Sequence, residues 1–137
     1  MTATFTDQGL QRIGINASQA TGFSSSRYFR TMSVDDSANA IATTDTAANS
    51  GGAVTNFYDQ AFDGTPTRLN QTITHEMTVP VGSGNYTIRR ILTHDDTVAN
   101  VTTSSTTLGW GVDGQTFAKT SDFTLKFILK LTFSQGP

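Results

Sequence analysis

The residues best able to do chemistry form two small groups, His75-Glu76 and His94-Asp95-Asp96. Together they offer imidazoles and carboxylates, a set of ligands that divalent transition metals accept in proteins. Asp95 and Asp96, however, follow a predicted strand, where aspartates are common as turn residues. Two histidines and scattered acids also occur in most chains of this length. We therefore favour the turn interpretation and expect neither a metal nor another cofactor.

Motifs of the common enzyme classes are missing from the sequence. There is no Gly-x-Ser-x-Gly elbow for a serine nucleophile, no phosphate-binding P-loop and no Gly-x-Gly-x-x-Gly fingerprint. Ser83 stands between two glycines, but a hairpin turn explains that segment. The chain has no cysteine, which excludes disulfides, thiolate ligands and a cysteine nucleophile. We therefore expect that the protein is not an enzyme and has no catalytic residues.

Side chains suited to contacts between proteins are more prominent. The guanidinium groups of Arg89 and Arg90 could pair with a carboxylate of a neighbouring chain. We favour the alternative, in which one arginine points to solvent and the other covers a bulge. Aromatic residues are more numerous than one small core requires, which is typical of a surface that a partner covers. The candidate interface residues are Phe5, Leu10, Phe57, Tyr58, Arg89 and Arg90.

Composition excludes several classes of protein. The chain has 137 residues, enough for one domain with one core, residues 1–137. Charged residues make up 15 %, against about 25 % in an average soluble domain, and Ser and Thr supply most of the polarity. The formal net charge is −2, so the chain has no excess of positive charge with which to bind a phosphate backbone. We therefore do not expect DNA or RNA as partners. This balance is typical of a β-rich domain.

Targeting signals are not evident in the sequence. The first residues lack the basic start and the apolar run of a signal peptide. No stretch approaches the roughly 18 apolar residues that a membrane span needs. We therefore expect synthesis in a cytoplasm and no contact with a membrane.

Alternating hydrophobicity predicts the strands of the core. In residues 123–133 every odd residue is a large apolar one, and only Ile128 breaks the polar even face. This pattern predicts an 11-residue strand that anchors the core. Residues 73–79 alternate in the same way, with His75 on the apolar face. Residues 86–94 form the returning strand of a hairpin, and a bulge near Arg89 would explain a change of phase.

The remaining elements are shorter. Further strands are predicted at residues 28–34, 54–62 and 107–112, the last with two glycines opposite Trp110 where a ring or backbone packs closely. Thr6 or Asp7 caps a short helix that carries Leu10 and Ile13 on its apolar face and ends at Gly14. Residues 37–52 are poor in bulky side chains, so we expect a mobile or partner-ordered loop. The predicted fold is mainly β, an antiparallel β-sandwich with a short N-terminal helix.

Three stretches carry a resemblance to a known family. Residues 5–13 are similar to an "L-T-x-x-G-L-x-x-I" start, and residues 86–96 are similar to a "T-I-R-E-I-G-L-F-D" element. Both motifs belong to the N-terminal domain of tail-collar and tail-fibre proteins of tailed bacteriophages, whose last strand the amphipathic residues 123–133 also resemble. Arg90 stands where that family has an acid, and residues 37–52 have no clear counterpart.

The resemblance implies a structural role in a virion. In that family the domain attaches a fibre or collar component to the particle, usually as a trimer. We accordingly expect a homo-oligomer that packs against other tail, collar, fibre or capsid proteins, with the virion as its location. A capsid decoration (cement) protein on the phage head is the alternative within the same class. A carbohydrate-binding, receptor-binding module is a second alternative, in which Trp110, Tyr86 or Tyr58 stacks on a sugar ring.

Overall fold

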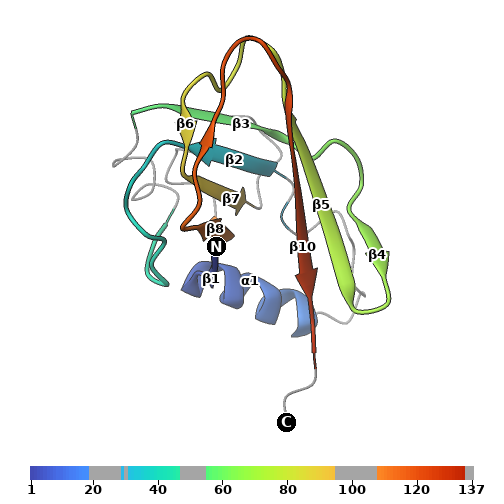
Figure 1. Ribbon diagram of the computed structural model, residues 1–137. Helices are drawn as coiled ribbons and strands as arrows, with labels where there is room; N and C mark the ends of the chain where they lie inside the picture. The colour runs from blue at the N-terminus through green and yellow to red at the C-terminus, as the bar shows by residue number, and fades with distance from the viewer. Residues whose placement is uncertain (19–28, 30, 47–54, 95–107, 135–137) are drawn as a thin grey trace.

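The computed structural model describes residues 1–18, 29, 31–46, 55–94 and 108–134 (Figure 1). Within these ranges the chain forms antiparallel strands and one helix. The elements are β1 (Thr2–Phe5), α1 (Asp7–Ser18), β2 (Thr31–Asp35), β3 (Phe57–Ala61), β4 (Thr67–Leu69), β5 (Thr72–Val79), β6 (Thr87–Ile88), β7 (Arg90–His94), β8 (Leu108–Asp113), β9 (Phe117–Ala118) and β10 (Leu125–Thr132).

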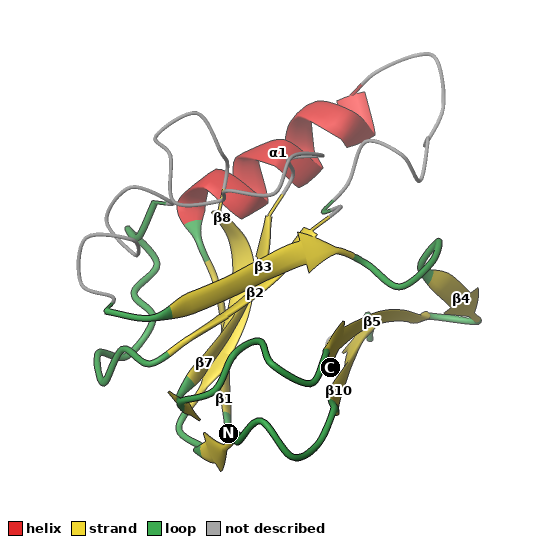
Figure 2. Ribbon diagram, turned by 90° about the horizontal axis from the view of Figure 1, so that it is seen from above, coloured by secondary structure: helices red, strands yellow, loops and turns green. Residues whose placement is uncertain are grey.

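The described strands form two sheets and a short two-stranded ribbon. The large sheet has the order β1-β8-β7-β2-β3, and the small sheet has the order β10-β5-β4. The ribbon pairs β6 with β9, and every strand pair is antiparallel. In Figure 1 the strands of the small sheet run steeply across those of the large sheet, and Figure 2 shows α1 lying along one side of the large sheet. The predicted fold class, mainly antiparallel β in a sandwich with one short helix, is confirmed.

The main core lies between the inner faces of the two sheets. The predicted alternation of β5 and β10 is confirmed, because Met77, Val79, Phe127 and Leu129 are buried and face the large sheet. Cross-strand neighbours on this face pair directly, as Phe127 does with Met77. The last strand is nevertheless shorter than the predicted residues 123–133.

The N-terminal helix is longer than the sequence predicts. The hydroxyl of Thr6 accepts a hydrogen bond from the Gly9 amide at 3.0 Å, which makes Thr6 the N-cap. The prediction that Gly14 ends the helix is wrong, since α1 continues to Ser18. An interior glycine costs a helix about 1 kcal/mol but does not break it. Ile13 packs against the core as predicted, whereas Leu10 is 55 % exposed.

The hairpin strand at residues 86–94 divides between two sheets. β6 joins the ribbon, β7 joins the large sheet, and Arg89 between them donates its amide to the Asp35 carbonyl at 2.8 Å. The predicted bulge near Arg89 is therefore a change of sheet. The irregularity that the ladder does contain falls at Thr93 and His94, opposite β8. The apolar pattern of residues 86–94 indicates the change of phase, but it does not show that a change of sheet is the cause.

The described part of the segment at residues 37–52 is a loop, as expected, since residues 37–46 contain no helix or strand. Residues 37–46 pack on the outer face of the large sheet, where Ile41 is buried with Leu92 and Leu108. The Ile41 amide donates to the Asp113 carboxylate at 2.7 Å, which fixes the segment. Residues 47–52 lie outside the described residues.

Candidate functional site

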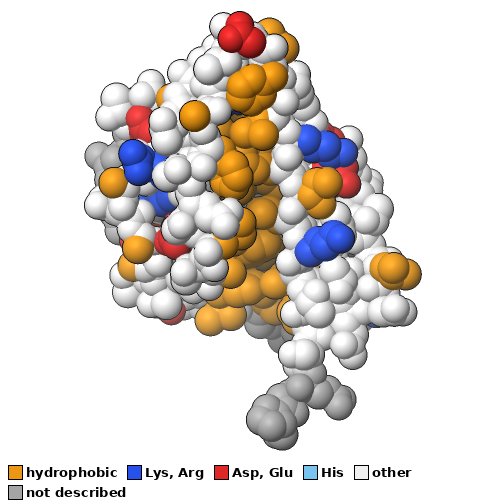
Figure 3. Space-filling view, in the orientation of Figure 1, with side chains coloured by type: hydrophobic (Ala, Val, Ile, Leu, Met, Phe, Trp, Pro, Cys, Tyr) orange, Lys and Arg blue, Asp and Glu red, His pale blue; other side chains and the backbone are white. Residues whose placement is uncertain are grey.

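In the part of the chain that the structure describes, hydrogen bonds join the two sheets on one side of the sandwich and leave the other side open. On the closed side, the Asp63 amide donates to the Glu76 carbonyl at 2.9 Å, and the Thr78 hydroxyl donates to the Asp63 carboxylate at 2.5 Å. These bonds tie the end of β3 to β5. On the other side, β1 ends the large sheet and β10 ends the small sheet, and they do not pair with each other. Figure 3 shows hydrophobic side chains gathered in a band along β10, between the sheets.

A groove of about 650 Å³ lies at one end of this open side. Its size falls within the range of roughly 300–1,000 Å³ that small-molecule sites occupy. We call it the β10 groove. Its wall and floor are formed by Ile13, Phe29, Ile73, His75, Leu131 and Phe133, and polar residues of the hairpin between β4 and β5 form its rim.

His75 is a neutral side chain in the floor of the β10 groove. Its ring packs against Phe62, with ring centroids 4.8 Å apart, and edge-on to Trp110 at 6.1 Å. Burial among these rings lowers the pKa of His75 to about 4, because desolvation penalises the charged form. Its Nδ1 has no hydrogen-bond partner among the described residues. At neutral pH the imidazole is therefore an uncharged part of an apolar surface.

The two histidine groups do not converge on a metal site. Strand alternation points His75 inward and Glu76 outward, where Glu76 forms an ion pair with Lys126 at 2.5 Å. His94 lies in the large sheet, with its Nε2 2.9 Å from the Ser33 hydroxyl. Asp95 and Asp96 lie outside the described residues. Among the described residues no three potential ligands cluster.

The two adjacent arginines have different environments. Arg90 is buried and forms a bidentate pair with Asp35, with nitrogen to oxygen distances of 2.8–3.2 Å. Its place as a candidate interface residue is therefore corrected, since the carboxylate that it binds belongs to its own chain, 55 positions away. Burial raises the pKa of Asp35, against the opposing effect of the Arg90 charge and hydrogen bonds. Arg89 is exposed, which agrees with the interpretation in which one arginine of the pair points to solvent.

Trp110 is too deeply buried to stack on a sugar ring. Only 2 % of the residue is exposed, and its ring stacks on Phe5 with centroids 5.9 Å apart. The glycines beside it do admit close neighbours, as predicted, since the Phe29 ring occupies the space that a side chain on Gly109 would need. The Tyr86 hydroxyl donates to the Val34 carbonyl at 2.9 Å and is thereby held inside the molecule. Of the three aromatic residues proposed for sugar stacking, at least Trp110 is therefore out of reach of a ligand.

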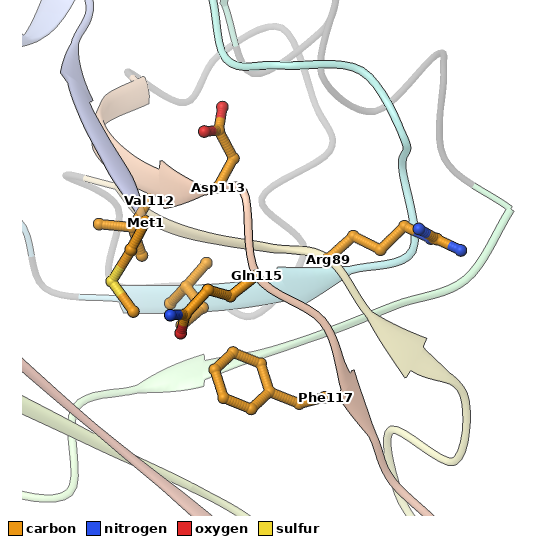
Figure 4. A pocket seen from close by; sticks show the side chains of 7 residues that line it. Met1, Arg89, Val112, Asp113, Gln115 and Phe117 are labelled. Carbon is orange, nitrogen blue, oxygen red and sulfur yellow. The ribbon is translucent and has the colours of Figure 1, made fainter.

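A second hollow near the N-terminus is too small for a ligand. Its volume of about 10 Å³ is about that of one water-sized probe. Figure 4 shows Met1, Gln115 and Phe117 around it, whereas the Arg89 side chain extends away from Phe117. This hollow therefore leaves the β10 groove as the candidate site.

The predicted interface residues do not form one surface. Phe5 lies on β1 and Phe57 and Tyr58 lie on β3, at opposite edges of the large sheet. Phe57 is 44 % exposed, whereas Phe5 and Tyr58 pack against the core. Sequence analysis missed two exposed aromatic residues that flank β10, Phe123 and Phe133, which are 41 and 50 % exposed. Their signal is the same alternation, which predicts burial along all of residues 123–133, whereas the positions at both ends of that range lie outside β10.

Comparisons with known proteins identify no relative of this chain. No protein-family model, no curated protein and no solved structure matches this chain. Among the described residues no helix is both long and apolar enough to cross a bilayer.

Proposed function

We propose that this protein is a structural subunit of a tailed-bacteriophage virion. In this proposal it forms part of the tail, collar or fibre assembly and acts by packing against copies of itself and neighbouring proteins. The observation that carries the proposal is the open side of the sandwich, where the β10 groove lies next to an edge of β10 that pairs with no other described strand. The motifs in residues 5–13 and 86–96 support the assignment to a phage particle.

The chemistry of the groove favours packing over catalysis. Its wall consists mainly of aliphatic and aromatic side chains, and its buried histidine is neutral at physiological pH. Such a surface gains free energy when a protein partner covers it, by about 25 cal/mol for each Å² of apolar area removed from water. The outer face of the small sheet carries several Thr side chains beside the Glu76–Lys126 pair and Lys130. The uncharged Thr side chains lose less hydration free energy than ions when an interface forms.

The site on the particle and the number of copies belong to the same proposal. A trimer attached to the tail or collar is what the sequence resemblance implies. A decoration protein on the capsid is the alternative, and it would use the same open side. In both cases the protein works without a cofactor and without binding nucleic acid.

The experiment is a search for the chain in assembled particles. Particles purified from a culture of the source phage or lysogen by density gradient are analysed by quantitative mass spectrometry. The proposal predicts the chain in a fixed ratio to the major capsid protein, at a few to a few hundred copies per particle. Antibodies labelling the tail would favour the tail or collar, and labelling over the head would favour decoration. Absence of the chain from intact particles would refute the structural role.

A further inference from the structure

The outer edge of β10 presents backbone groups that point away from the small sheet. The Phe133 amide donates to the Gln71 carbonyl at 3.0 Å, in the register that continues the β10 and β5 ladder. In an antiparallel pair the hydrogen-bonded positions alternate, so odd residues of β10 bond to β5. The amides and carbonyls that point outward therefore belong to the even residues, Lys126, Ile128, Lys130 and Thr132. No other described strand pairs with them.

The sequence around β10 reads almost the same in both directions. Residues 123–133 are Phe-Thr-Leu-Lys-Phe-Ile-Leu-Lys-Leu-Thr-Phe, with Ile128 at the centre. Of the five pairs of positions that lie at equal distances from Ile128, four hold identical residues, and the fifth holds Phe127 and Leu129. Burial of one face explains why apolar and polar residues alternate, but it does not require the two halves of the strand to match. Such a strand is complementary to a second copy of itself that runs in the opposite direction.

We propose that two copies of the chain pair antiparallel through the outer edges of β10, about a two-fold axis at Ile128. In this register even residues lie opposite even residues, so the outward-pointing backbone groups of each copy bond to those of the other. The contact joins two three-stranded sheets into one sheet of six strands. The inference rests on the proposed function, because it specifies a contact through which copies pack.

The inner side chains of the two strands match across this contact. Phe123 of one copy lies opposite Phe133 of the other, and Leu125 lies opposite Leu131. Phe123 and Phe133 are exposed in a single copy, so the pairing removes apolar area from water. Facing aromatic side chains stabilise an antiparallel pair further. The hydrophobic band in Figure 3 lies along β10 on this open side, so the pairing brings the bands of the two copies together.

The outer face of β10 contains one residue that burial within a single copy does not explain. Ile128 is the only apolar residue at the even positions of residues 123–133, and it is 52 % exposed. In the proposed pair it lies at the two-fold axis, beside Ile128 of the other copy. Thr124 likewise lies opposite Thr132, where two hydroxyl groups can bond to each other.

The lysines are the one unfavourable feature of the contact. Lys126 of each copy lies opposite Lys130 of the other, and like charges at such positions destabilise a sheet. Lys126, however, is already paired with Glu76 of its own chain, at 2.5 Å. A carboxylate therefore accompanies each lysine pair and offsets part of the repulsion.

A contact of this kind is isologous, since each copy uses the same surface. It joins copies in pairs, so the assembly contains an even number of them, as in a dimer or in two rings joined face to face. The edge of β10 is then covered, which also removes a template for uncontrolled strand pairing.

The first test measures the dissociation constant of the dimer by analytical ultracentrifugation. Ile128→Pro removes an amide that points outward and that the ladder with β5 does not use, so the variant should fold. It is expected to raise the dissociation constant about tenfold or more, because the backbone hydrogen bonds at the axis are lost. Ile128→Leu is the matched control, since it keeps both the amide and the apolar volume, and it should dimerise as wild type does. Circular dichroism of each variant establishes that it is folded.

The second test determines the register with cysteines, of which the chain has none. Ile128→Cys alone should form a disulfide with itself under mild oxidation, because facing Cα atoms of a hydrogen-bonded pair lie about 5.5 Å apart, within disulfide range. Thr124→Cys and Thr132→Cys should couple with each other when mixed, and each should couple little with itself. Val81→Cys, in the exposed turn after β5, is the control and should stay reduced.

The outcomes separate this inference from the structural role. Self-coupling of Thr132→Cys, dimers of Ile128→Pro as tight as those of wild type, or a wild-type chain that stays monomeric at millimolar concentration would overturn the pairing. The structural role would then still stand if the chain is found in purified particles. Dimers with the expected coupling, together with absence of the chain from particles, would refute the structural role and leave the pairing in place.

Discussion

At the scale of single residues, the buried histidine of the β10 groove links stability to pH. His75 has a pKa of about 4 in the folded protein, against 6.5 in an unfolded chain. The unfolded state therefore binds more protons between these values, and stability falls as the pH drops from 6.5 towards 4. Above pH 6.5 the full stability is present, because both states are then neutral.

His75→Leu is expected to remove this part of the pH dependence. Wild type should lose about 2–3 kcal/mol more free energy of unfolding than the variant between pH 7 and pH 4.5. Urea denaturation at both pH values measures the difference, in which the shared effects of the carboxylates cancel. Equal losses in the two proteins would show that His75 is protonated as easily in the fold as in water.

The ion pair between Asp35 and Arg90 is the second residue-scale feature that can be tested. Both side chains are buried, and Asp35 also accepts the Ser37 amide at 3.0 Å. Asp35→Ala leaves the Arg90 charge without this counter-ion and should cost about 3–5 kcal/mol of unfolding free energy. Asp45→Ala is the control, since Asp45 is only partly buried and its carboxylate accepts a hydrogen bond from the nearby Ala42 amide rather than an ion pair. A loss at Asp35 no greater than at Asp45 would mean that Arg90 reaches solvent.

At the scale of elements, a glycine contact sets how closely α1 approaches β8. A side-chain carbon added to Gly9 would lie 2.0 Å from the Gly109 carbonyl oxygen. The Thr6 hydroxyl donates to the Leu108 carbonyl in the same place, and the Thr6 amide donates to the Gly109 carbonyl at 3.0 Å. Backbone therefore packs on backbone, and the helix has no room to shift without breaking these bonds.

Gly9→Ala is expected to destabilise the fold by about 1–3 kcal/mol, since overpacking outweighs the higher helix propensity of alanine. Gly64→Ala is the matched control, because nothing lies within 4 Å of the added carbon and its φ is not positive. That control should change stability by no more than about 1 kcal/mol, in either direction. The thermal unfolding midpoints of the two variants measure this difference. Similar midpoints would contradict the close approach of α1 to β8 at Gly9.

Element positions followed from the sequence where one strand face is buried. The alternation of β5 and β10 was predicted residue by residue, because a period of two reports which face the core covers. Boundaries were less accurate, as at Gly14 and at the ends of β10, because packing partners decide where a strand stops. The division of residues 86–94 into β6 and β7 depended on Asp35, which bonds to the Arg89 amide from a distant part of the chain.

At the scale of the whole molecule, the open side predicts assembly. Phe133 lies in the β10 groove and is half exposed, so it contributes little to the core of one copy. Phe133→Ser should change the unfolding free energy of the monomer by less than the roughly 3 kcal/mol of a fully buried side chain. It should nevertheless abolish assembly, since the partner would cover a hydroxyl in place of a ring.

Val81→Ser in the turn after β5 is the control for this prediction. Val81 is 58 % exposed but does not line the β10 groove. Its replacement should alter neither folding nor the mass of the assembly measured by light scattering. Equal loss of assembly in both variants would indicate general stickiness, and no loss in either would exclude the β10 groove as an interface.

The sequence by itself determined which residues face inward, since the spacing of apolar side chains in a strand reflects one buried face. It also determined the fold class, because low charge, frequent turn residues and alternating apolar positions are together typical of a β domain. Only the tertiary structure decided that Arg90 meets Asp35, that His75 and His94 lie in different sheets, and that the sandwich stays open beside β10 among the described residues. Those facts depend on which distant segments come together, and the local pattern of a strand carries no information on what lies across from it.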